Sequence, residues 1–195
     1  MAAARSYPPG NGGQRRASAP VPGLSGDAVL PDPLDHLAGE NRCRRVICGF
    51  LDTLVAALPH PDPTLAGEVL THLKTALPRH IRDEEGDLFP LLRRRSQTDA
   101  DINDTLDRLI ADHAHASAML EPIQAALERL VLRGTAFTAE EATAITAFAA
   151  RERRQLIVEN GIVLPLARVR LSQSDLKSLR LRMLQRRHTD TDTAH

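Results

Sequence analysis

Residues 80–95, HIRDEEGDLFPLLRRR, and residues 155–170, QLIVENGIVLPLARVR, follow the same pattern. The two stretches agree at the aligned pairs Glu84 and Glu159, Gly86 and Gly161, Pro90 and Pro165, Leu91 and Leu166, Arg93 and Arg168, and Arg95 and Arg170. The first copy opens with His80 and the second with Gln155, so the repeat loses its most reactive side chain in one copy. The repeat indicates that the chain consists of two related helical hairpins.

Helical periodicity extends from residue 34 through most of the chain. It predicts long helices over about 34–58, 63–94, 102–132 and 138–168, followed by a short basic helix over 176–187. Pro78 is expected to kink or break the second helix, and Thr138 with Glu141 forms a capping box for the fourth. Because the turns are short and no segment has a strand pattern, the sequence predicts an all-α, up-down-up-down four-helix bundle plus a short C-terminal helix.

The two ends of the chain differ from this central part. Residues 1–31 are rich in Pro, Gly, Ala and Ser and predict a disordered N-terminal arm. The bundle is expected to span 32–187, and 188–195 to form a flexible tail.

The composition excludes several classes of function. Lys and Arg total 25, as do Asp and Glu, so no global charge favours nucleic acid or an anionic membrane as a partner. No apolar run is long enough for a membrane span or a secretory signal. On a helix, Cys43 and Cys48 would have Cα atoms about 8–9 Å apart, beyond the ~7 Å limit for a disulfide. We therefore expect a cytoplasmic protein with two free thiols. No pattern of hydrolase or nucleotide chemistry is present, so we expect no enzyme.

The candidate functional residues begin with the repeated glutamates. His80 and Glu84 are four residues apart, on one face of a helix, where an imidazole and a carboxylate can bind a transition metal; the alternative is an exposed pair. Glu159 lies in an apolar segment, where burying an unpaired carboxylate is costly. It therefore binds a metal or pairs with a cation, for which Arg153 and Arg154 are the nearest choices in the sequence.

Histidines elsewhere are less distinctive. His113 lies in the third helix, in the sequence ADHAHAS, and is either a ligand or an ordinary core or surface histidine. His115 is two residues further on and is expected to point to the opposite face, into solvent. His72 is two turns from His80, across the break expected at Pro78, and is interpreted as a polar residue near the end of the bundle.

Four stretches together resemble the hemerythrin-like, or HHE cation-binding, family in its bacterial cytoplasmic branch. They are DPLDHLAGENRCRRVICGFLDTL (32–54), LPRHIRDEEGDLFPLLRRR (77–95), DHAHASAML (112–120) and ARERRQLIVENGIVLPLARVRLSQSDL (150–176). The resemblance implies a four-helix bundle that holds a non-haem di-iron site between its helices. By position, it implies that His80 and His113 are terminal ligands and that Glu84 and Glu159 bridge the irons.

Two family histidines are replaced by amides. Related first helices resemble DPLDFIAEDHLRER, whose His falls on Asn41, and related fourth helices resemble ERRHLILEN, whose His falls on Gln155. Amide oxygens are poorer donors to iron than imidazole, so Asn41 and Gln155 are at best weak ligands. His36 is a possible substitute, but it precedes Asn41 by five residues and lies about 140° away around the helix.

Two hypotheses of function remain open. In the first, the protein binds non-haem iron or another metal, and takes part in O₂, NO or redox sensing or in iron handling. In the second, it is a metal-poor bundle that serves as a structural or protein-interaction module, with Asn41 and Gln155 in a hydrogen-bond network that replaces the metal. The basic helix over 176–187 could bind an acidic partner, but its leucines favour a role in closing one end of the bundle.

Overall fold

The computed structural model describes residues 32–192 and the side chains of residues 32–189. Its helices are α1 (Pro33–Ala56), α2 (Pro63–Lys74), α3 (Ala76–Asp83), the π-helical turn η1 (Glu84–Leu88), α4 (Phe89–Arg95), α5 (Ala100–Arg133), α6 (Ala139–Val158), the π-helical turn η2 (Glu159–Val163), α7 (Leu164–Arg170) and α8 (Gln173–Asp192). Over the described range, no residue belongs to a strand.

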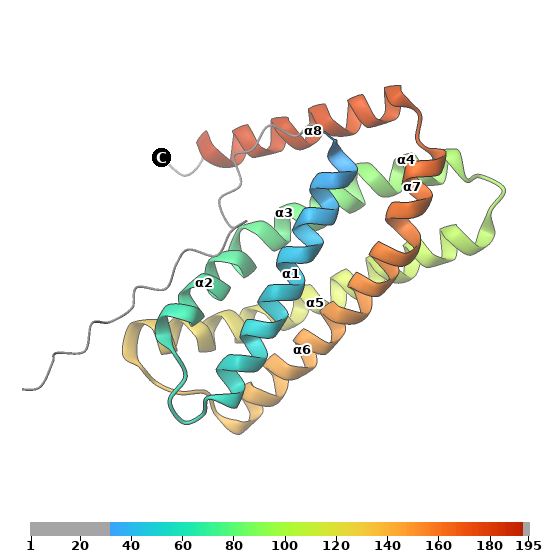
Figure 1. Cartoon of the computed structure of the whole chain (residues 1–195). Coiled ribbons are helices and arrows are strands. Elements are labelled where there is room, and N and C mark those ends of the chain that lie inside the picture. Colours follow the sequence, from blue (N-terminus) through green and yellow to red (C-terminus); the bar gives the residue numbers. More distant parts are fainter. Residues whose placement is uncertain (1–31, 193–195) are drawn as a thin grey trace, which may run out of the picture.

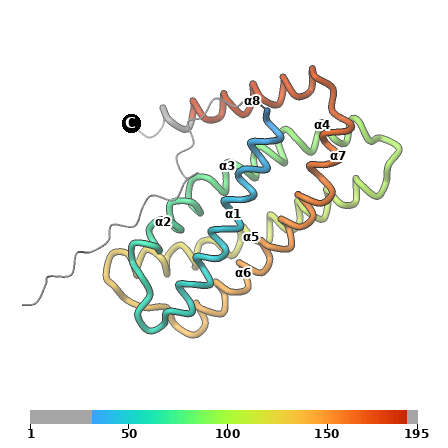
Figure 2. The backbone as a smooth tube through the Cα atoms, viewed as in Figure 1, coloured from blue at the N-terminus to red at the C-terminus, as the bar shows by residue number. Residues whose placement is uncertain are grey.

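Four long arms form the bundle (Figures 1 and 2). The first is α1, the second runs from α2 through α4, the third is α5, and the fourth runs from α6 through α7. α1 packs against α2 and α6, and α5 packs against the same two helices. α8 lies across the bundle and contacts α1 and η1. The predicted four-helix bundle with a C-terminal helix is confirmed.

Side chains at the helix ends explain where the arms begin and stop. Asp32 caps the backbone N–H groups that open α1, and Asp99 does the same for α5. The expected capping box of Thr138 and Glu141 is present at the start of α6. Gly134 ends α5 with a φ of 64°, a left-handed conformation in which glycine is favoured.

The second and fourth arms are interrupted in ways that the helical pattern did not fully predict. The break expected at Pro78 occurs at Thr75, because the proline ring collides with the carbonyl four residues earlier. The predicted continuous helices are wrong at η1 and η2, where one π-helical turn precedes Pro90 and Pro165 respectively. The repeated sequence therefore encodes a repeated π-helical turn, a feature that is frequent at functional sites.

The core has two apolar clusters with a polar layer between them. The first cluster includes Leu51, Leu73, Leu127 and Phe148, and the second includes Leu37, Phe89, Leu106 and Ala167. Every arm therefore passes from one apolar cluster to the other through the buried polar layer, formed by Asn41, Arg44, His80, Asp83, Glu84, Asp87, His113, Glu152, Gln155 and Glu159. Because water is excluded on both sides, each polar group in this layer needs a partner. Asp83 and Asp87 find theirs in arginines of α8, and the others depend on one another.

The ends of the bundle correct one prediction. α8 begins at Gln173 and continues to Asp192, so the helix extends beyond its predicted end at residue 187. The predicted arm, 1–31, and residues 193–195 lie outside the described residues. Both cysteines are free, as expected. None of the described helices is both long and apolar enough to cross a membrane.

Candidate metal centre

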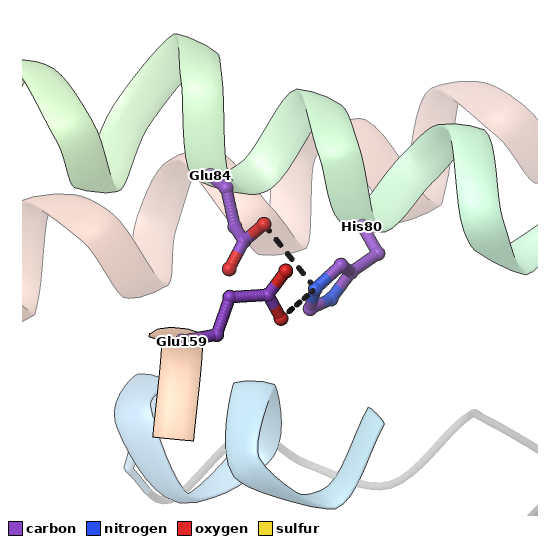
Figure 3. A group of neighbouring side chains, drawn as sticks. All are labelled: His80, Glu84 and Glu159. Atoms are coloured by element: carbon purple, nitrogen blue, oxygen red, sulfur yellow. Dashed lines mark ion pairs between the residues drawn. The ribbon is translucent and has the colours of Figure 1, made fainter. Parts of the chain in front are cut away.

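The four predicted ligands converge in the polar layer (Figure 3 shows three of them). All four side chains are buried. The Nε2 atom of His80 lies 3.5 Å from Glu84 Oε2 and 3.9 Å from Glu159 Oε2. The Nε2 atom of His113 lies 3.6 Å from Glu84 Oε2 and 3.7 Å from Glu159 Oε1. His80, Glu84 and Glu159 also form a group whose ligand atoms all lie within 4.8 Å of one another.

The two π-helical turns place the carboxylates. Glu84 is the first residue of η1 and Glu159 is the first residue of η2, so both occupy the same position in the repeat. His80 lies one turn before Glu84 on α3. His113 lies in the middle of α5, where its ring stacks on Phe89 with 6.2 Å between ring centroids and 13° between ring planes. Phe89 thus holds the imidazole from the side of the second apolar cluster.

Outer carboxylates orient both imidazoles. His80 Nδ1 lies 2.9 Å from Glu40 Oε2, and His113 Nδ1 lies 2.8 Å from Glu85 Oε1. Because a carboxylate accepts hydrogen bonds, Nδ1 is the donor in each pair, and Nε2 faces the centre of the layer. A carboxylate behind a histidine is the usual support of a metal-binding imidazole. Burial raises the pKa of Glu40, but its hydrogen bonds to His36 and His80 outweigh burial and hold that pKa well below its usual range.

One part of the layer lacks hydrogen bonds. Among the described residues, neither Glu84 oxygen, nor Glu159 Oε1, nor His113 Nε2 has a hydrogen-bond partner. We call these three side-chain groups the open half. Their separations of 3.6–3.7 Å are too long for hydrogen bonds. They are close to the roughly 3.0–3.6 Å between neighbouring ligands that each lie about 2.1 Å from one metal ion.

The charge of the open half favours a cation. Burial lowers the pKa of His113, but Glu159 and Glu84 outweigh it and raise that pKa above its ordinary value. A positive charge is therefore stabilised between these groups, either as a proton on the imidazole or as a metal ion. A metal ion could accept lone pairs from several of these groups, whereas a proton on Nε2 is too far from either carboxylate for a good hydrogen bond.

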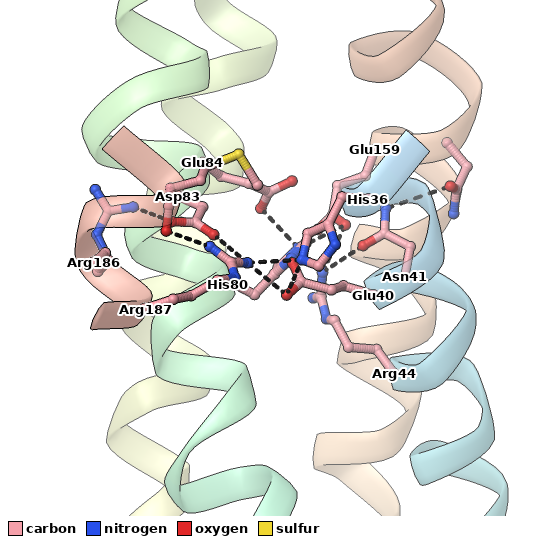
Figure 4. Close-up of polar contacts among 12 residues, drawn as sticks. His36, Glu40, Asn41, Arg44, His80, Asp83, Glu84, Glu159, Arg186 and Arg187 are labelled. Atoms are coloured by element: carbon pink, nitrogen blue, oxygen red, sulfur yellow. Dashed lines mark hydrogen bonds and ion pairs between the residues drawn. The ribbon is translucent and has the colours of Figure 1, made fainter. Parts of the chain in front are cut away.

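Arg44 fills the other part of the layer (Figure 4). Its Nη1 donates to Glu159 Oε2 at 2.7 Å and lies 2.9 Å from His80 Nε2. Its Nε and Nη2 both donate to Glu152 Oε2, at 3.2 and 3.0 Å. Arg44 is only 2% exposed. Together with Asn41 and Gln155, these residues form what we call the arginine half. Glu159 belongs to both halves, with one carboxylate oxygen in each.

The two amides that replace family histidines bind this arginine. Asn41 Oδ1 accepts from Arg44 Nη1 at 3.2 Å, and Gln155 Oε1 accepts from Nη2 at 3.3 Å. Both carbonyl oxygens are therefore used by the guanidinium. His36 does not substitute for them, because its Nε2 lies 3.0 Å from Glu40 Oε1 and 2.8 Å from Arg187, outside the layer's centre. His36 lies off the centre of the layer, as its phase on α1 indicates, and contacts Arg187 of α8; a ligand role for it stays an untested prediction.

The short contact between Arg44 and His80 fixes the form of that imidazole. Burial lowers the pKa of His80, but Glu84 outweighs burial and the charge of Arg44 and raises that pKa well above its ordinary value. The contact with Arg44 opposes this shift, because an N–H group of arginine can approach Nε2 to 2.9 Å only if Nε2 carries a lone pair. His80 is therefore neutral while Arg44 donates to it. For Glu159 the direction is plain: Arg44 holds the pKa of this carboxyl well below its usual range despite burial.

The sequence itself matches a known family over this whole region. Residues 32–167 match the model of the hemerythrin HHE cation binding domain. The chain belongs to this family. No curated protein matches the chain closely enough to suggest a more specific role. The match reaches into all four arms and includes every residue of the polar layer, so the family assignment from the sequence is confirmed, while the ligand role of individual residues stays a prediction.

The hemerythrin-like site has the donors for one metal ion but not for two. The unpaired atoms of the open half fit a single cation. A second ion would need His80 Nε2 and Glu159 Oε2, which Arg44 Nη1 already contacts. At about 4 Å and an effective dielectric of about 20, a divalent ion and a guanidinium repel by roughly 8 kcal/mol. The di-iron site expected from the resemblance therefore does not fit the residues present.

The formal charge of the layer also favours one metal ion over two. Asp83 and Asp87 are balanced by Arg186 and Arg187 of α8. The other buried carboxylates of the layer, Glu84, Glu152 and Glu159, together with the guanidinium of Arg44, leave a net formal charge of −2. One divalent cation balances this charge, and two would exceed it.

The sequence analysis missed Arg44, and the signal was present. Position 44 lies three residues after Asn41, on the same helical face, within a stripe that is otherwise apolar from Leu37 to Leu51. A charged residue in such a stripe needs a buried partner. The partners proposed for Glu159, Arg153 and Arg154, were chosen by proximity in the sequence. Of these, Arg153 pairs with Asp52 at the surface.

Proposed function

We propose that this protein binds one divalent transition-metal cation, iron(II) by family precedent, in the open half of its polar layer. His113, Glu84 and Glu159 would hold the ion, and His80 lies within reach on the side of Arg44. One observation carries the proposal: the buried Nε2 of His113 lies 3.6 and 3.7 Å from one oxygen of Glu84 and one of Glu159, and none of these atoms has a hydrogen bond among the described residues. Leaving such groups unpaired costs about 1–3 kcal/mol each, and a cation would remove that cost.

The surrounding residues support a role in handling small ligands or electrons. When bound, ferrous iron would supply a one-electron couple and a site for O₂ or NO. The protein's own contribution is to hold few strong donors, to orient His113 through Glu85, and to exclude bulk water with the two apolar clusters. We therefore propose O₂, NO or redox sensing, or iron handling, as the role of the bound ion, without catalytic turnover.

Metal content tests this function. The full-length protein would be expressed in iron-supplemented medium and purified without oxygen, and its metal counted by mass spectrometry. We expect about one ion per chain, and an absorption or EPR change when NO is added. Glu84→Gln and His113→Ala should each lose the ion, whereas Glu128→Gln, which affects only an exposed pair with Lys74, should keep it. Wild-type protein without metal, and with a melting temperature that chelator does not change, would reject the proposal.

A second function is favoured by the arginine half. Arg44 connects α1 to α3, α6 and η2 through the hydrogen bonds already described, without a metal. A bundle stabilised in this way could serve as a structural or protein-interaction module. The same measurement separates the two functions, because the module needs no metal in either half.

A further inference from the structure

Arg44 occupies its position as a metal ion would. Three lone-pair atoms from three arms converge on its Nη1: Asn41 Oδ1 on α1, His80 Nε2 on α3 and Glu159 Oε2 on η2, at 3.2, 2.9 and 2.7 Å. Nη1 carries only two hydrogens, so three acceptors around it exceed what ordinary pairing requires. The acceptors are therefore arranged around Nη1 as they would be around a positive ion.

The rest of the guanidinium is bound equally closely. Glu152 accepts from both Nε and Nη2, and Gln155 accepts from Nη2. Glu152 is buried, and Arg44 is the cation paired with it in the structure. Glu152 thus compensates the charge of Arg44 at one end while Glu159 does so at the other. Both partners keep the guanidinium in one orientation, pointing toward the open half.

Arg44 keeps its charge in this environment. A lysine or histidine could release a proton to admit a metal ion, whereas an arginine does not. The positive charge beside His80 is therefore permanent.

We infer that Arg44 acts as a built-in replacement for a second cation and limits this site to one metal ion. The inference rests on the proposed function, since it concerns the number of ions at the same site. Arg44 occupies the atoms that a second ion needs, and its charge repels any ion that approaches them. The amides at positions 41 and 155 complete this arrangement, because their oxygens accept from the guanidinium while adding no charge.

The test counts ions in variants of position 44. Full-length wild-type protein, Arg44→Met, Arg44→Lys and Arg153→Met would be dialysed against Co²⁺, and bound cobalt and protein measured together. We expect one ion per chain for the wild type and for Arg153→Met, the same substitution at an exposed ion pair. Arg44→Lys, whose ammonium group can release a proton, should admit a second ion only as the pH rises. Arg44→Met should bind two, because His80, Glu159 and Glu152 become free as donors.

A spectroscopic measurement separates this role from a purely structural one. An isolated Co²⁺ in the wild type should give an EPR signal, and a second ion a few ångströms away in Arg44→Met should weaken that signal by magnetic coupling. If Arg44→Met does not fold, Arg44→Met/Glu152→Gln removes the unpaired carboxylate along with the cation and should still bind a second ion.

The outcomes distinguish the inference from the proposed function. One ion in the wild type, and also one in Arg44→Met and in Arg44→Met/Glu152→Gln, would overturn the inference and leave the single-ion function intact. Two ions in the wild type would also overturn it. No ion in the wild type but one or more in Arg44→Met would reject the proposed function and support exclusion by Arg44. No ion in any variant would reject both.

Discussion

In the arginine half, the acceptors around Arg44 receive hydrogen bonds from its guanidinium, whereas in the open half Glu84 and His113 face each other across 3.6 Å without one. The two halves lie in the same layer and share Glu159. They differ in what provides positive charge: a side chain in one and, on our proposal, a bound metal ion in the other. The comparison shows that this fold can hold an arginine among the histidines and glutamates of the layer while their framework stays in place.

Removing the arginine should have the largest effect on stability. Arg44→Met leaves Glu152 and Glu159 buried without their cation, and breaking one partner of a buried ion pair costs about 3–5 kcal/mol. We expect this loss in urea unfolding of the metal-free protein. Glu152→Gln added to the same variant should restore part of it. Arg153→Met, at an exposed pair, should lose only about 0–1 kcal/mol; equal losses in the two single variants would mean that the arginine half has no special role.

Removing a carboxylate from the open half should not destabilise the metal-free protein, in contrast to removing Arg44. Glu84→Gln removes a buried carboxylate that makes no hydrogen bond, so the metal-free protein should be unchanged or more stable by about 1 kcal/mol. The same variant should lose the rise in melting temperature that Co²⁺ gives the wild type, since binding stabilises only a site that exists. A clear destabilisation of the metal-free Glu84→Gln variant would show that the carboxylate has a protein partner and that the halves do not differ as described.

A smaller effect is expected at the edge of the open half. Glu85 orients His113 through the bond to Nδ1, and removing such a support typically weakens metal binding about 10–100-fold. Glu85→Gln should therefore raise the dissociation constant for Co²⁺ by about this factor, measured by competition with a chelator dye. Glu68→Gln, on α2, serves as the matched control and should not change it.

The smallest expected effect is the influence of the Arg44 charge on the pKa of His72. Burial, then Arg44 and His80, lower the pKa of His72 to about 4, while Glu40 raises it and Arg79 lowers it. Because the folded protein binds this proton less well than the unfolded chain, His72 costs no stability at neutral pH and costs stability as pH falls from about 6.5 toward 4. Removing the charge in Arg44→Met should move the NMR titration of His72 to higher pH. An unchanged titration would mean that the charge of Arg44 does not influence His72.

The sequence predicted the fold well because helical periodicity, caps and turns are local signals. The four arms, the break near Pro78 and the capping box of Thr138 follow from patterns within a few residues. The π-helical turns at Glu84 and Glu159 did not follow, because a single wider turn changes the periodicity by less than the pattern resolves. Their repeated Glu-x-Gly-x-x-x-Pro sequence was the visible sign.

The site was predicted in its residues but not in its charge balance. His80, Glu84, His113 and Glu159 were all identified, and the structure brings them together. The exchange of histidines for Asn41 and Gln155 was also visible, yet its reason was not, because Arg44 reaches Glu152 and Glu159 across more than a hundred residues. Pairing of this kind depends on how helices pack, which no local pattern encodes.

The most direct measurement is the anomalous scattering of crystals grown with Co²⁺. The account predicts one cobalt peak, bounded by His113, Glu84 and Glu159, with Arg44 still hydrogen-bonded to Glu159 and Glu152. Two peaks, with the Arg44 side chain displaced, would contradict the account, and so would a layer with no peak in which Glu84 and His113 have found hydrogen-bond partners of their own.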